Sequence, residues 1–315
     1  MLALFKDRIF LLYIFLFGIS NWFLRNQYPV EDVLSSTLIL GIFFPLLAWV
    51  LSRNATPLYR DKPLQWREPV VILFIIFYIT IWLTWGTGWV SRNIPAIIGD
   101  NAQAKYIFNT IKKLVVFVII PCWIYHLKYG FNLKDFGAGF SIRELASKKS
   151  LIILAGVGIP MLLFQYFLGG GAAPIREGKF SAYQMLIGFP LLFISLVIEV
   201  GLVEEFFFRA LLQSRLTVWL RSARGGILVG GLIFGLAHVP GLWLRGASSL
   251  EGLSPDAGIG AILAVAVVNL SIAGIFIGVI WHYTKSLWLV MIIHALVDLL
   301  PNFGEFVSIF HIWGA

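Results

Sequence analysis

The chain has 315 residues, of which 59% are hydrophobic and only 13% are charged, and its mean hydropathy is +0.87. Soluble domains carry roughly 25% charged residues because their surfaces must be hydrated, so this composition excludes a soluble globular protein. The formal net charge of +8 comes from basic residues spread over short loops, which is typical of membrane topology and anionic-lipid contact and excludes a nucleic-acid-binding protein.

Apolar stretches recur along the chain at lengths near the roughly 20 residues that a helix needs to cross a bilayer. We therefore predict an all-α, polytopic transmembrane helical bundle with about eight or nine spans. The nine candidate spans cover residues 9–25, 33–51, 69–90, 112–127, 150–169, 184–208, 225–244, 258–283 and 286–300. The fourth and ninth candidates are short, and the count becomes eight if one of them is re-entrant.

Lysine and arginine indicate how the spans run. If the N-terminus is cytoplasmic, the cytoplasmic loops hold about twice as many basic residues as the opposite side, as expected from the positive-inside rule. The segment 91–113 opposes this trend, because it places four basic residues on the other side. We expect a multi-pass protein of a bacterial or archaeal plasma membrane with its N-terminus in the cytoplasm.

Ionisable side chains are costly in hydrocarbon, so those inside apolar spans are functional candidates. They fall on the sixth, seventh and ninth predicted spans, all in the second half of the chain. The sixth span and the residue directly after it hold four of them, the seventh holds one and the ninth two, namely Glu199, Glu204, Glu205, Arg209, His238, His294 and Asp298.

Helical spacing sorts the acids of the sixth span. Glu205 and Arg209 are four residues apart, so they share a helix face and can form an ion pair. Glu204 lies roughly 100° around the helix from Glu205, so it does not share the helix face of Arg209. A carboxylate in an apolar site without a full partner is suited to act as a general base.

The same spacing links residues on the other two spans. His294 and Asp298 are four residues apart, so Asp298 can orient the imidazole ring. Gly231 and Gly235, on the span that carries His238, form a small-xxx-small pair that lets another helix approach closely. We expect the acid of the sixth span and the two histidines to line one cavity that opens to the cytoplasm.

Three motifs follow one another on these spans: Glu204-Glu205-xxx-Arg209, Phe234-xxx-His238 and His294-xxx-Asp298. In this order they resemble the CPBP family of intramembrane proteases, which includes type II CAAX prenyl endopeptidases and Abi-like bacterial membrane proteins. The resemblance covers about residues 184–300. It indicates a catalytic membrane domain over residues 150–315, preceded by an N-terminal transmembrane region, residues 1–149, whose role is less defined.

The resemblance implies hydrolysis of a peptide bond near the C-terminus of a membrane-anchored peptide or protein, prenylated or carrying a sorting signal. Glu204 would activate water with help from His238. His294 and Asp298 would stabilise the tetrahedral oxyanion. Prenyl-protease members usually have Asn where Asp298 stands, and an aspartate must carry a proton before it can donate a hydrogen bond.

Glu205 and Arg209 would hold the end of their helix in position, although a purely structural buried ion pair explains them equally well. Two histidines and a glutamate could also bind zinc, but the sequence has no HExxH pair, and we expect no cofactor. Glu199 is interpreted as protonated or paired with Asn269.

Two other functions share this fold class. A non-proteolytic scaffold or immunity protein would predict loss of the motif side chains, which are all present. A proton-coupled transporter would predict paired repeats and interrupted helices, and the sequence shows neither.

Overall fold

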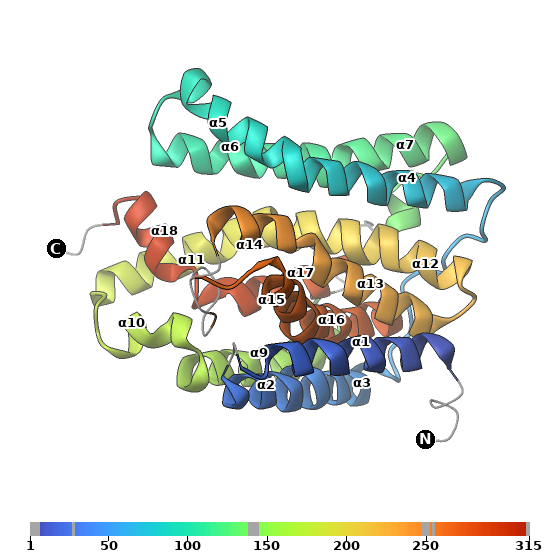
Figure 1. Ribbon diagram of the computed structural model, residues 1–315, viewed down its shortest axis with the longest axis horizontal. Helices are drawn as coiled ribbons and strands as arrows, with labels where there is room; N and C mark the ends of the chain where they lie inside the picture. Colours follow the sequence, from blue (N-terminus) through green and yellow to red (C-terminus); the bar gives the residue numbers. More distant parts are fainter. Residues whose placement is uncertain (1–6, 27–28, 138–144, 247–252, 254–255, 313–315) are drawn as a thin grey trace. The chain divides into compact units, whose positions relative to one another are not determined.

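The computed structural model describes residues 7–26, 29–137, 145–246, 253 and 256–312 (Figure 1). Within these ranges the regular elements are all helices and no strand occurs, which confirms the all-α prediction for this part of the chain. The protein forms two compact units. Unit 1 comprises Met1–Ser91 with Phe208–Lys285, and unit 2 comprises Arg92–Phe207 with Ser286–Ala315.

Seven helical stretches of the described chain are long and apolar enough to cross a bilayer, so the protein is a multi-pass membrane protein. They are Val33–Ser52, Glu68–Val90, Ala102–Tyr129, Lys148–Leu168, Ala182–Trp219, Ala223–Leu244 and Ile259–Thr284. Leu287–Leu299 and Phe303–Ile309, which meet at 83°, add an eighth if they count as one span. Arg8–Leu24 is a shorter apolar helix. All nine predicted stretches are therefore helical.

The fourth span begins ten residues earlier than residue 112, where the sequence placed it. The Asn101 side chain accepts a hydrogen bond from the Ala104 N–H at 2.8 Å and starts the helix there. Three elements, α6 (Ala102–Leu114), η3 (Val115–Ile119) and α7 (Ile120–Tyr129), follow without a break. The first turns of this helix are amphipathic, so their average hydropathy is too low for them to be recognised as part of a membrane span. Lys105, which the topology argument assigned to a loop, is consequently on the same helix as Lys112 and Lys113.

Unit 1 is built around α13 (Ala223–Ala237), which packs against α16 (Ser271–Thr284), and α16 also packs against α3 (Phe44–Ser52). A Cβ atom on Gly231 would lie 3.0 Å from the carbonyl oxygen of Ser271, and one on Gly274 would lie 2.9 Å from Gly231 Cα. Only glycine permits this approach, which confirms the predicted role of the small residues on the seventh span.

Unit 1 has further helices in the described part of the chain. They are α1 (Arg8–Leu24), α2 (Val30–Ser35), η1 (Ser36–Phe43), α4 (Glu68–Ile81), η2 (Trp82–Gly86), α12 (Ser214–Trp219), α14 (Val239–Arg245), α15 (Ile259–Val265) and η9 (Ala266–Leu270). Two further helices, α5 (Thr87–Ile98) and η7 (Glu205–Gln213), each contain a boundary between the units.

Unit 2 is organised around α17 (Leu287–Leu299), which packs against α9 (Lys148–Leu168), α11 (Ala182–Leu196) and η6 (Val197–Leu202). Its apolar core includes Leu192, Leu196 and Phe303, and the Phe303 ring stacks on that of Phe189 with centroids 4.0 Å apart. The remaining described helices of unit 2 are α6, η3 and α7, together with η4 (Leu133–Phe136), η5 (Gly170–Ala172), α10 (Ala173–Arg176) and α18 (Phe303–Ile309).

Both units draw residues from the two predicted regions, 1–149 and 150–315. The division of the chain into these two functional regions stays a prediction.

A buried ionic network ties the segment before α4 to the rest of unit 1. Arg215 donates to both carboxylate oxygens of Glu68, at 2.5 and 2.9 Å, and Glu68 is fully buried. Lys285 donates to Asp61 at 2.7 Å and to Ser214 at 3.1 Å. Burial lowers the pKa of Lys285, and Asp61 acts in the opposite direction. The network fixes residues 61–68 against α12 and the end of α16.

Removing one partner of this network should destabilise the protein strongly. We expect Glu68→Ala to lower the free energy of unfolding by about 3–5 kcal/mol, because the Arg215 guanidinium is left buried without a carboxylate. Thermal unfolding in detergent measures the effect, with Glu31→Ala, at an exposed acid, as the matched control. Equal unfolding temperatures for the two variants would contradict a stabilising role for the pair.

Candidate functional site

The six motif residues divide between the two units. Unit 2 carries Glu204 and Glu205 at the junction of η6 and η7, together with His294 and Asp298 on α17. Unit 1 carries the other two residues, described below. The expected convergence of both histidines on Glu204 joins residues of different units and stays a prediction.

The central contact of unit 2 is a carboxylate against an imidazole. Nδ1 of His294 lies 2.5 Å from Oε1 of Glu205. Glu205 is fully buried and His294 is 5% exposed. A hydrogen bond between a carboxylate and a ring nitrogen in such surroundings is strong, because the local dielectric constant is low. It also fixes the orientation of the ring.

A close approach of two backbones places this contact. A Cβ atom on Gly201 would lie 2.7 Å from the carbonyl oxygen of Met291 and 3.1 Å from its Cα atom. Glycine is therefore the residue that lets η6 meet α17 there. Met291 precedes His294 by about one helical turn. The chain from Val197 to Leu202 is a π-helical turn, a wider form that is frequent at functional sites.

The partner of His294 differs from the one that spacing predicted. Nε2 of His294 is 3.9 Å from Oδ2 of Asp298, which is longer than a hydrogen bond. Glu205, from another helix, instead holds Nδ1. A separation of four residues makes two side chains neighbours on one helix, but packing between helices decides which neighbour the ring contacts. The Asp298 side chain, 31% exposed, stands near the opposite ring nitrogen.

Glu204 and Glu205 have different surroundings, as their positions around the helix predict. Glu205 is fully buried, whereas Glu204 is half-buried. Part of the Glu204 side chain therefore lies at the protein surface, whereas Glu205 is enclosed by the protein.

Arg209 and His238 are anchored within unit 1. The Arg209 guanidinium, 1% exposed, lies over the Phe234 ring at 4.3 Å and donates to the Gly274 carbonyl at 3.5 Å. Nδ1 of His238 lies 2.8 Å from the Phe234 carbonyl oxygen, at the C-terminal end of α13. Phe234 thus positions both residues. The predicted pairing of Arg209 with Glu205 joins different units and stays a prediction.

Unit 2 contains a second intramembrane ion pair that the sequence did not reveal. Nζ of Lys113 lies 2.7 Å from Oε1 of Glu199, so Glu199 has a lysine partner in this unit. Lys113 was missed because the sequence analysis counted it among the basic residues of segment 91–113 and not among the ionisable residues of the spans. The amphipathic pattern over residues 102–114 is the signal that would have found it.

A metal ion is another means of activating water at such residues. Because Nδ1 of His294 and Nδ1 of His238 are both engaged by the protein, zinc would have to bind through Nε2 of each ring. Within the described ranges, no group of three or more His, Cys, Asp or Glu side chains is arranged to hold a metal ion. The expectation that no cofactor is needed stays a prediction, and no step below uses a metal.

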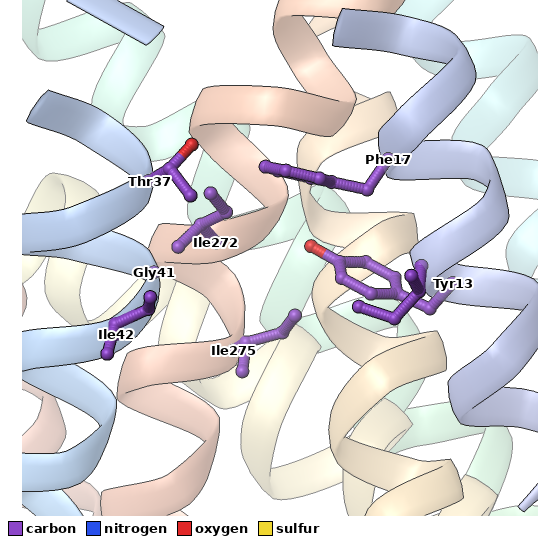
Figure 2. Close-up of a pocket in the computed structure, with 8 residues that line it drawn as sticks. Tyr13, Phe17, Thr37, Gly41, Ile42, Ile272 and Ile275 are labelled. Atoms are coloured by element: carbon purple, nitrogen blue, oxygen red, sulfur yellow. The ribbon is translucent and has the colours of Figure 1, made fainter. Parts of the chain in front are cut away.

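A cavity of about 210 Å³ lies in unit 1 (Figure 2). Aromatic side chains of α1 and aliphatic side chains of α16 face it, with η1 on the third side. Tyr13, at its wall, shares a hydrogen bond of 2.8 Å with Ser271. The residues that line the cavity are almost all apolar, and they include none of the six motif residues. It therefore offers no groups for acid–base chemistry.

Comparison with known proteins agrees with the motifs. Residues 186–300 match the family model described as type II CAAX prenyl endopeptidase Rce1-like. The matched segment contains all six motif residues and corresponds to the predicted resemblance over residues 184–300. At the level of the family, the match supports a CAAX-type intramembrane protease. No curated protein and no solved structure is significantly similar to the chain.

The approach at Gly201 gives a direct test of how the site is held together. We expect Gly201→Ala to lower the free energy of unfolding by about 1–3 kcal/mol, because the new methyl group overlaps the Met291 backbone. Gly18→Ala is the matched control, since a Cβ atom there meets nothing within 4 Å. Thermal unfolding of the two variants in the same detergent measures the difference. An unchanged midpoint for Gly201→Ala would show that η6 and α17 are not closely packed.

Proposed function

We propose that the protein cleaves membrane-anchored substrates. The proposal starts from the match of residues 186–300 to the Rce1-like type II CAAX prenyl endopeptidase family. The bond hydrolysed lies near the substrate's C-terminus, and the substrate is prenylated or carries a sorting signal. The observation that supports this most is the buried contact between Glu205 and His294. Ionisable groups at such depth mark functional sites in membrane proteins.

Glu204 acts as the general base in this proposal. It accepts a proton from a water molecule while the water oxygen forms a bond to the substrate carbonyl carbon. The carbon–nitrogen bond then breaks, and the proton passes from Glu204 to the departing amine. His238, anchored through Nδ1, assists by orienting the water. The partial exposure of Glu204 is consistent with contact to water.

His294 stabilises the oxyanion that forms on the carbonyl oxygen. In this role the ring is doubly protonated, with Nδ1–H donating to Glu205 and Nε2–H donating to the oxyanion. Asp298, 3.9 Å from Nε2, donates a second hydrogen bond when it carries a proton. Preorganised donors in a low-dielectric site stabilise a developing charge strongly. Glu205 supports this step because it holds the ring before the substrate arrives.

Arg209 serves the same site indirectly, because it holds the helix that continues from Glu205. Its cation is placed over Phe234, the residue that also anchors His238. We also propose that the N-terminus is cytoplasmic and that the membrane is the plasma membrane of a bacterium or archaeon. A cytoplasmic face would admit the soluble end of a membrane-anchored tail.

Single substitutions test the assignment. We expect Glu204→Ala, His238→Ala and His294→Ala each to reduce the cleavage rate at least about 100-fold, because each removes an acid–base or oxyanion group. A farnesylated peptide with a C-terminal CAAX sequence and an unprenylated peptide with a basic sorting tail are the two probes. His311→Ala, at an exposed histidine, is the control. Full activity of Glu204→Ala on a probe that the wild type cleaves would refute the role of this glutamate.

Chelation tests the absence of a metal step. We expect dialysis against a strong zinc chelator to leave the cleavage rate unchanged, because Glu204 and the histidines suffice in this mechanism. The rate is measured on the same two peptides before and after dialysis. Loss of activity that added zinc restores would overturn the metal-free mechanism.

A further inference from the structure

The helix from Ala102 to Tyr129 contacts the helix that carries Glu204 and Glu205, although it lies outside the segment that matches the family. Its contacts fall on both sides of the two glutamates. Two are polar and precede them, at Ser195 and Glu199. One is aromatic and follows them, at Phe207. All these residues belong to unit 2.

The ion pair is the most specific of these contacts. Nζ of Lys113 lies 2.7 Å from Oε1 of Glu199, with side-chain exposures of 35% and 13%. Lys113 is 11 residues inside its helix and Glu199 is 17 residues inside its own, counted from Ala102 and Ala182. Ionisable side chains within membrane-spanning helices are retained where they pair.

A pair of hydroxyl groups adds to the ion pair on the same side of the helix. The hydroxyl groups of Tyr106 and Ser195 lie 2.9 Å apart. One helix therefore contacts Ser195 through Tyr106 and Glu199 through Lys113. The Glu199 carboxylate is thus held five residues before Glu204.

Aromatic contacts hold the chain just after the glutamates. The Phe117 ring meets the Phe207 ring edge-on at 5.3 Å, and the Phe136 ring meets the Phe206 ring at 5.4 Å. The rings of Phe136, Phe206 and Phe207 are 1–2% exposed. The segment between Ser195 and Phe207, which contains both glutamates, is thus fixed at its two ends by residues 102–136.

We propose that the ion pair between Lys113 and Glu199 is a positioning element for the contact between Glu205 and His294. The N-terminal region thereby becomes part of the catalytic unit. This inference rests on the proposed protease function for its kinetic consequences. Its structural consequence, a fixed orientation of the His294 ring, does not depend on that function.

The charges have a role that the aromatic contacts cannot supply. Apolar side chains gain little from contact with each other when lipid tails are the alternative, so they set position weakly in a bilayer. This ion pair is partly buried, and removing one partner leaves an uncompensated charge beside the helix. The pair therefore fixes the rotation of the helix that carries Glu205.

Two neighbouring lysines provide the test. Lys113→Ala removes the pairing cation, whereas Lys112→Ala removes a lysine whose Nζ contacts Asn109 of its own helix at 2.7 Å. We expect Lys113→Ala to lower kcat roughly 10- to 100-fold at unchanged KM, because the reacting groups are displaced while substrate contacts stay intact. Lys112→Ala should keep the wild-type kcat. The probe is the farnesylated CAAX peptide in proteoliposomes.

A charge exchange separates positioning from general loss of folding. The double variant Lys113→Glu with Glu199→Lys restores the pair in reverse, so kcat should recover most of its loss. A double variant as impaired as Lys113→Ala would overturn the inference. Equal losses for Lys112→Ala and Lys113→Ala would also overturn it.

A readout without substrate distinguishes this inference from the protease assignment. In protein labelled with ¹⁵N-histidine, the Nδ1 signal of His294 is assigned by its loss in His294→Gln. We expect the signal to shift in Lys113→Ala, to stay in Lys112→Ala and to return in the double variant. If the wild type cleaves neither peptide, the protease assignment fails and this signal still decides the positioning role. An unshifted signal in Lys113→Ala would refute it.

Discussion

The contact between the Glu205 carboxylate and the His294 imidazole is the constraint on which the rest of unit 2 depends. Two ionisable groups in an apolar interior destabilise a fold unless they meet, so the helices that carry them must approach at one position and one rotation. Gly201 makes the approach possible, because any larger residue would overlap the Met291 backbone. Glu199, paired with Lys113, sets the rotation.

The same arrangement explains why adjacent glutamates take different parts. Glu205 is buried and committed to the histidine ring, while Glu204 keeps partial exposure. In the proposed mechanism the committed carboxylate orients the group that stabilises the oxyanion, and the exposed one handles water. In unit 1, Phe234 has a comparable double role, since it anchors His238 through its carbonyl and Arg209 through its ring.

The sequence predicted the helices and the residue types of the candidate site, but it did not predict which side chains of different helices contact each other. Apolar length located nine helical stretches, and the order of the three motifs predicted the family whose model matches residues 186–300. Helical spacing proposed Asp298 as the partner of His294, yet Glu205 from a different helix holds Nδ1. The turn from Val197 to Leu202 is π-helical, and the residue pattern there did not predict this form. The pairing of Lys113 was not predicted, because the helix that carries it begins with amphipathic turns whose average hydropathy is low.

The most direct test of the central claim is a double-mutant cycle on the cleavage rate with Glu205→Gln and His294→Gln. If the carboxylate acts only through the ring, the double variant should cleave no more slowly than the slower single variant, because residues that work as one unit are strongly non-additive. Losses that multiply in the double variant would show that Glu205 and His294 act separately, and would contradict the account.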